Sequence, residues 1–282
     1  MKWRNARGSR NIEDRRGQTV RRGGMGIVGV IAVVLIGMIF GVDVSPLLQS
    51  AGQGTRIESN DGQLTQADQQ AGQFVSATLG YTEEIWSDIF PEQVGKNYRP
   101  ATLVLFKGIT QSPCGNASGA TGPFYCPGDR KIYLDTDFFT TLSRKFGAGG
   151  DFAAAYVVAH EVAHHVQNEL GILPKVNQAR RSMNQTDSNH ASVMVELQAD
   201  CFSGIWARLA SDRLGVVEAN DIQEALNAAK QIGDDTMQRS AGRRPMPHTF
   251  THGTSEQRQR WFARGYQSAD MRQCDTFAAD RL

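Results

Sequence analysis

The sequence predicts a mostly helical α+β domain with a small β-sheet, preceded by one N-terminal transmembrane helix. Three observations predict this class: long stretches with apolar residues at helical spacing, two short stretches rich in β-branched residues, and one uncharged run of about the 20 residues that cross a bilayer. With 282 residues the chain can bury a substantial core. Its formal net charge of +1 is balanced, so no nucleic-acid partner is expected.

The charge pattern at the N-terminus predicts a membrane anchor and its direction. Residues 1–22 are rich in Lys and Arg, and the run 23–42 carries no charge. Because basic residues collect on the cytoplasmic side, we expect 1–22 to be a basic cytoplasmic segment and 23–42 to be a transmembrane helix. A cleavable signal peptide is the alternative, but the run is longer than a signal-peptide core and no small-x-small cleavage site follows it. We therefore expect a single-pass protein of the cell membrane.

Everything after the anchor is expected in the periplasm or outside the cell. Residues 43–63 are rich in Gly, Ser and Gln and should form a flexible linker, and 64–282 should form the folded domain. A helical pattern spans about 67–90, where Gly80 is expected to divide it into two helices. The strands are expected at 101–107 and 131–134.

Further helices are expected in the second half of the chain. They are predicted at 138–146, from Asp151 as N-cap to about Leu170, at 190–210 and at 218–232, with a polar surface loop at 175–189. Thr254 and Gln257 have the spacing of a capping box, which predicts the start of a final amphipathic helix.

The cysteines predict disulfide bonds, because an even number lies in a domain expected in an oxidising compartment. Four cysteines allow three pairings. Cys114 and Cys126 bracket a short Gly-rich loop, which favours a bridge between them and leaves Cys201 to pair with Cys274. Four unpaired thiols are the alternative. A cysteine zinc site is disfavoured, because the chain has no CxxC spacing.

The stretch His160-Glu161-Val162-Ala163-His164 predicts a metal site. On a helix, His160 and His164 lie about 40° apart on one face, so their rings can bind one ion. Glu161 flanks that face, where a general base for metal-bound water belongs. This is the HExxH arrangement of zinc metallopeptidases. Chance spacing on a buried helix is the alternative, but unpaired ionisable groups would be costly there. His165 points about 140° away from His160 and is expected to be structural.

A zinc ion held by two histidines needs a third protein ligand. Glu196 is the best candidate, and Asp200, one turn later on an apolar helix, should accept a hydrogen bond from a ligand histidine, in the first place His160. His190 is a rival ligand, but it lacks the spacing by which other zinc peptidases supply a third histidine.

Two other features are candidates for contacts with substrate. His252 and Arg258 lie around the start of the last helix, where either could stabilise an oxyanion, although a structural role is equally expected for His252 and favoured for Arg258. The stretch 124–134 is a candidate edge strand that binds an extended substrate by strand addition, with a plain covering sheet as the alternative.

Several stretches resemble the bacterial membrane-anchored family of neutral zinc metallopeptidases, the YpfJ-like family. The resemblance covers nearly the whole chain and rests on Arg15-Arg16-Gly17, GPFYCPGDRKIYLD, HEVAHHVQ, ELQADCFSGIWA and TFTHGTSEQRQRWF. It implies a zincin-like, gluzincin-type metallopeptidase domain with zinc ligands His160, His164 and Glu196 and general base Glu161. The motif order is also similar to peptidases with HExxH, ExxxD and then Thr-His-Pro; here Gly253 replaces the proline, which leaves the role of His252 open.

These features predict a membrane-anchored, zinc-dependent peptidase with one Zn²⁺ per chain and peptide or protein substrates. Zinc would lower the pKa of a bound water toward about 7, and Glu161 would take its proton and return it to the leaving amine. One alternative is a zinc-binding scaffold protein without turnover, which the retained Glu161 disfavours. Another is a hydrolase of a non-peptide cell-envelope amide. An intramembrane protease is disfavoured, because the motif is far from 23–42.

Overall fold

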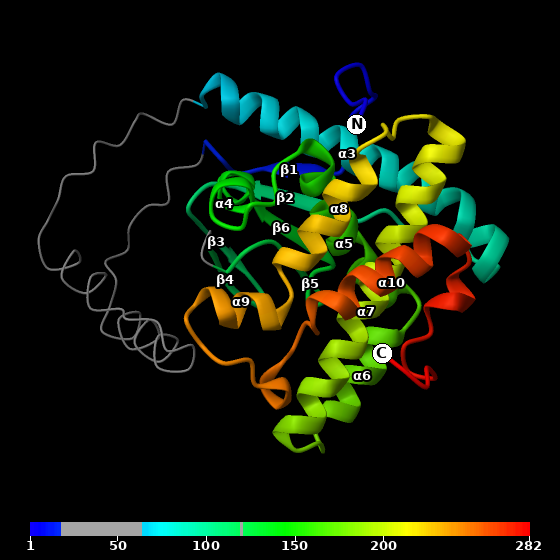
Figure 1. Ribbon diagram of the computed structural model, residues 1–282. Coiled ribbons are helices and arrows are strands. Elements are labelled where there is room, and N and C mark those ends of the chain that lie inside the picture. The colour runs from blue at the N-terminus through cyan, green and yellow to red at the C-terminus, as the bar shows by residue number, and fades with distance from the viewer. Residues whose placement is uncertain (18–63, 119–120) are drawn as a thin grey trace, which may run out of the picture. The chain divides into compact units, whose positions relative to one another are not determined.

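Figure 1 shows the computed structural model, which describes residues 1–17, 64–118 and 121–282. Met1–Arg15 and Thr65–Leu282 form one compact unit, the folded domain. The transmembrane helix expected at 23–42 and the linker expected at 43–63 lie outside the described residues. Among the helices that are described, none has the length and apolar character needed to cross a bilayer.

A small mixed sheet forms one part of the domain, with strand order β1-β2-β6-β5. The strands β1, β2 and β6 run parallel, and β5 is antiparallel to β6. Both expected strands are confirmed, as β2 and β6. The strand bounds are Ile12–Asp14 for β1, Thr102–Phe106 for β2, Phe124–Cys126 for β5 and Lys131–Asp135 for β6.

The central strands are buried almost throughout, as expected when both faces of a parallel pair are covered. On one face, Leu103 and Ile132 join the main core beside the helices. On the other face, Val104 and Tyr133 pack with Ala117 of a two-stranded hairpin, β3 (Ile109–Ser112) and β4 (Gly115–Ser118).

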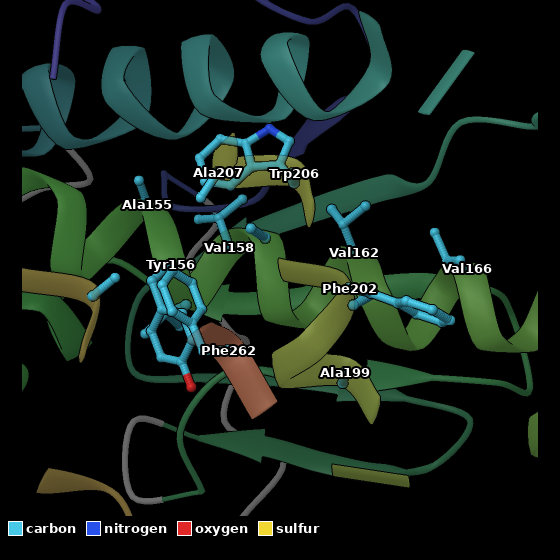
Figure 2. Close-up of a cluster of buried hydrophobic side chains, with 14 of the residues drawn as sticks. Ala155, Tyr156, Val158, Val162, Val166, Ala199, Phe202, Trp206, Ala207 and Phe262 are labelled. Atoms are coloured by element: carbon cyan, nitrogen blue, oxygen red, sulfur yellow. The ribbon is translucent and has the colours of Figure 1, made fainter. Parts of the chain in front are cut away.

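Helix α5 (Asp151–Glu169) lies at the centre of the helical part and packs against α3, α7 and α8. Figure 2 shows Val158 and Val162 of α5 in one cluster with Phe202 and Trp206 of α7. The helices are α3 (Gln66–Ile89), α4 (Phe138–Arg144), α6 (Ile172–Arg180), α7 (Gln185–Leu209), α8 (Asp221–Gln231), α9 (Asp234–Ser240) and α10 (Ser255–Ser268), with short π-helical or 3-10 turns at Phe90–Val94, Ala210–Leu214, Pro247–Thr249 and Met271–Cys274.

Most of the expected helices are present, but one expected loop is partly helical and one expected N-cap is wrong. The loop at 175–189 is partly helical, because α6 begins at Ile172 and Pro174 falls in its first turn, where no intrahelical N–H bond is lost. Gly150, and not Asp151, is the N-cap of α5. The capping box of Thr254 and Gln257 is confirmed at the start of α10.

The N-terminal residues contribute to the domain, which the sequence did not predict. β1 pairs with β2, Ser9 N donates to Ser76 O at 2.9 Å, and Glu83 accepts from Asn11 Nδ2 at 2.8 Å. Strand pairing requires both strands on one side of a membrane. β1 and β2 therefore lie on the same side of any membrane.

Gly80 does not divide α3, which is one helix of 24 residues. Packing explains the glycine at this position, because a Cβ at Gly80 would lie 2.8 Å from Arg7 O and 3.3 Å from Ser9 N. The glycine therefore makes room for the N-terminal segment to cross the helix. A pattern read along α3 alone cannot distinguish this use of glycine from a helix break.

Both expected disulfides are confirmed. Cys114 pairs with Cys126, and Cys201 pairs with Cys274. The second bond joins the middle of α7 to the C-terminal 3-10 turn. It links parts of the chain that are 73 residues apart.

We predict that Gly80→Ala has opposite effects with and without the N-terminal segment. Ala is the better helix former by about 1 kcal/mol, so in a chain starting at residue 64 the change should raise the free energy of unfolding by about that amount. In the full chain the clash with Arg7 O should instead lower it by about 1 kcal/mol. Urea unfolding measures both, and effects of the same sign would contradict the packing of residues 7–9 on α3.

Candidate metal centre

The two motif histidines lie one turn apart on α5, with ring centroids 4.8 Å apart. Glu196 reaches them from α7: its Oε2 is 3.0 Å from Nε2 of His160, and its Oε1 is 3.5 Å from Nε2 of His164. One ligand atom from each residue lies within 4.8 Å of the others. Two imidazole nitrogens and one carboxylate are a donor set that suits zinc, which in catalytic sites takes a water molecule as its fourth ligand.

The pKa shift of Glu196 favours its ionised form, in which a carboxylate binds a metal ion. Burial alone would raise the pKa of Glu196, but His164, His252 and His160 together hold it well below its usual value. Burial alone would lower the pKa of His160, but Asp200 and Glu196 raise it to about 10. His160 must therefore release a proton before it can bind a metal ion.

Asp200 lies on the far side of His160 from the ligand cluster. Its Oδ1 is 2.9 Å from Nδ1 of His160, an ion-pair distance, although the alignment is not that of a hydrogen bond. The same carboxylate accepts from Tyr156 Oη at 2.5 Å. Asp200 is thus placed to orient the ring of His160 so that Nε2 faces Glu196.

Arg258 neutralises Asp200. Its Nε and Nη2 donate to the two carboxylate oxygens at 2.8 and 3.0 Å, and its Nη1 donates to Ile232 O at 3.3 Å. The side chain is 2% exposed. Since these donors are already occupied, the structure places Arg258 in a structural ion pair and not at an oxyanion.

Glu161 is buried on α5 beside the two histidines. Burial raises the pKa of its carboxyl, while His164 and His160 act in the opposite direction. Its carboxylate makes no hydrogen bond with the part of the chain that the structure describes. It is therefore free to accept a proton from a water molecule, and a raised pKa suits a base that works near neutral pH.

His252 lies in a loop that Asp234, the first residue of α9, holds together. Oδ2 of Asp234 accepts the backbone N–H groups of Thr251, His252 and Gly253 at 2.8, 2.6 and 3.0 Å, and its Oδ1 is 3.3 Å from Nδ1 of His252. The ring is half exposed, with Nε2 unengaged among the described residues. His252 and Glu196 are close enough to shift each other's pKa.

Gly253 has φ +92°, a conformation that proline cannot adopt. A Cβ there would lie 3.2 Å from Leu197 and 3.3 Å from Val193, both on α7. The glycine thus seats the loop against the helix that carries Glu196. This explains why the sequence departs from Thr-His-Pro, and it keeps His252 beside the metal-binding residues.

The remaining candidate residues lie apart from the ligands. His190 is exposed on α7 and is not in the cluster. His165 is buried, with Nδ1 at 3.2 Å from Tyr125 Oη and Nε2 at 2.7 Å from Arg99 O, as expected for a structural residue. It ties strand β5 to α5.

Only part of the proposed substrate strand lies at an edge. Within 124–134, β6 is interior, between β2 and β5, and β5 is the edge strand. In the described part of the chain, the outer side of β5 has no strand partner. β5 also packs against α5, and Tyr125 of β5 contacts His165 of α5.

Sequence reasoning did not identify two residues that contact the site. Asp234 is 18 residues from His252, and nothing in that spacing indicates the contact. Gln167 contacts His164, with Oε1 at 2.9 Å from Nδ1. Its position one turn after His164 was a usable signal, because residues three apart on a helix share a face.

Comparison with known proteins agrees with this geometry. Residues 1–277 match the family model described as "Putative neutral zinc metallopeptidase". The uncharacterized protein YpfJ of Escherichia coli K12 is 42% identical over 98% of this chain and 99% of its own length. The uncharacterized protein Rv2575 of Mycobacterium tuberculosis H37Rv is 40% identical over 87% of this chain and 86% of its own. No solved structure matches the chain significantly.

The family match covers nearly the whole chain, and the residues that the motif supplies converge on one point in the fold. The chain belongs to the putative neutral zinc metallopeptidase family.

Proposed function

We propose that this protein is a zinc-dependent peptidase in which Glu161 is the general base. The observation that carries the proposal is the convergence of His160, His164 and Glu196 beside a carboxylate that makes no hydrogen bond within the described chain. One zinc ion held by these three residues would supply an acidified water and polarise a scissile carbonyl. Glu161 would accept the water's proton and pass it to the leaving amine.

Two other parts of the chain support a peptide substrate. The free edge of β5 offers backbone groups to an extended chain next to the metal helix, which aligns a peptide by strand addition. Nδ1 of His252 faces Thr251 Oγ1 and Asp234 Oδ1 at 3.0 and 3.3 Å, and the protonated ring, which Glu196 and Asp234 favour, can donate a hydrogen bond from Nε2 to the oxyanion. A scaffold protein without turnover could use the strand edge for binding, but it would have no use for an oxyanion donor.

The location of the domain is also part of the proposal. Two disulfides support an oxidising compartment outside the cytoplasm. The apolar run 23–42 is the candidate for membrane attachment. Because residues 1–15 pack on the domain, we infer that both flanks of that run lie on the domain's side of the membrane, in place of the cytoplasmic N-terminus expected from charge.

Glu161→Gln should retain zinc and lose hydrolysis by at least about 100-fold, because the amide cannot take a proton. Metal content by atomic absorption and cleavage of a peptide library by mass spectrometry measure both, with the exposed Glu256→Gln as matched control. Glu196→Ala should weaken zinc binding. Zinc binding without cleavage that depends on Glu161 would favour the scaffold or a cell-envelope amide, and the amide is then tested with cell-wall crosslinks.

His252→Gln should lower kcat by about 10- to 1,000-fold at unchanged zinc content, because a neutral amide lacks the positive charge with which the protonated imidazole stabilises the oxyanion. Burial acts to lower the pKa of His252, but Glu196 and Asp234 raise it. Asp234→Asn should therefore lower the pKa of His252, which NMR titration of the ring follows. Wild-type turnover in His252→Gln would remove this residue from the mechanism.

A cysteine introduced by Asn5→Cys should react with a membrane-impermeant maleimide in intact spheroplasts. Asn5 is exposed and belongs to the segment that packs on the domain. Arg244→Cys, exposed in the domain itself, is the control. If Asn5→Cys reacts only after the membrane is opened, while Arg244→Cys reacts at once, the N-terminus is cytoplasmic.

A further inference from the structure

Gln167 lies outside the HExxH motif and has no part in the proposed hydrolysis. It lies on α5 one turn after His164, and it is 0% exposed. A buried amide is costly unless both of its ends are hydrogen-bonded. All of its hydrogen bonds are made with a metal-binding residue, His164, or with α7, the helix that carries Glu196.

The amide of Gln167 has only one orientation compatible with its neighbours. Its Nε2 lies 2.8 Å from Val195 O, a backbone carbonyl that can only accept. The NH₂ group must therefore face Val195, and Oε1 must face Nδ1 of His164, 2.9 Å away. Because Oε1 can only accept, Nδ1 must carry the hydrogen. The Nε2 atom of His164 is then left with its lone pair, as a metal ligand needs.

A second glutamine reinforces this orientation. Gln167 Nε2 also donates to Gln198 Oε1 at 3.0 Å, and Gln198 Nε2 donates to Cys274 O at 3.0 Å. Cys274 O is another backbone carbonyl, so it fixes the direction of Gln198 in the same way. Two carbonyls thus determine the direction of every hydrogen bond in the series that ends at His164.

The same amide also connects the two helices that carry the ligands. Val195, which accepts from Gln167, directly precedes Glu196 on α7. A displacement of α7 along α5 would break this bond as it moved Glu196. Gln167 is therefore bonded to one ligand directly and to the backbone beside another.

The two histidines are supported by different chemistry. Nδ1 of His160 faces Asp200, a carboxylate paired with Arg258. Nδ1 of His164 faces a neutral amide. Since the amide cannot itself ionise, the tautomer of His164 is set by hydrogen-bond geometry and not by a charge.

We propose that Gln167 is a positioning residue for the metal centre, which fixes the Nδ1–H tautomer of His164 and holds Glu196 in register with α5. This rests on the metal site of the proposed function but not on peptide hydrolysis. Its consequence is seen in zinc affinity, which can be measured without a substrate.

The test is zinc affinity by chelator competition on the full chain. Gln167→Met keeps the volume of the side chain but removes the acceptor of His164 and the donor to Val195 O. It should weaken zinc binding by about 10- to 100-fold. Thr276→Val is the matched control, because Thr276 is equally buried and donates to Met194 O of the same helix at 2.7 Å but contacts no ligand. It should change zinc affinity by less than about threefold, even where it lowers stability.

Two outcomes overturn the proposal: wild-type zinc affinity in Gln167→Met, or an equal loss in Thr276→Val. If Gln167→Met does not fold, Gln167→Asn decides, since its shorter amide cannot reach both His164 Nδ1 and Val195 O; a severalfold loss of zinc affinity supports the proposal and wild-type affinity overturns it. If the wild type binds no zinc, the proposed function fails as well. If the wild type binds and Gln167→Met binds equally, only the role of Gln167 fails.

Discussion

The metal-binding residues depend on the close packing of α5 against α7, because neither helix carries a complete ligand set. α5 supplies His160 and His164, and α7 supplies Glu196. Between them, Val162 and Phe202 belong to the same apolar cluster (Figure 2). A shift of one helical turn, about 5.4 Å, would take Glu196 out of reach. The core beneath the site therefore determines the geometry of the ligands.

The same packing explains why a distant helix belongs to the site. Asp200 lies fully buried behind His160, and an unpaired carboxylate there would cost several kcal/mol. Arg258 of α10 pairs with it through two bonds. α10 can lie this close to α7 because both have glycine at the contact: a Cβ on Gly265 would lie 1.8 Å from Cys201 O. Small residues in the contact thus allow the charges to meet.

The two ends of the chain are also held by contacts between segments distant in sequence. The bond between Cys201 and Cys274 fixes the C-terminal turn on α7, where Cys274 O receives the hydrogen bond of Gln198. At the other end of the chain, β1 covers one edge of the sheet and leaves β5 as the free edge beside α5. The C-terminal turn therefore contributes to the surroundings of the metal centre, and the folded domain includes residues 1–15 as well as 65–282.

What the sequence determined by itself is local. The spacing of His160, Glu161 and His164, the pair Glu196 and Asp200, and the capping box of α10 each lie within two helical turns, where periodicity defines which side chains share a face. Only the tertiary structure decided that Asp234 holds the loop of His252, that Gln167 faces the carbonyl next to Glu196, that Gly80 admits the N-terminal segment, and that β1 joins the sheet. Each of these depends on a contact between segments distant in sequence, and a side chain's partner across such a distance is chosen by packing and not by spacing along the chain.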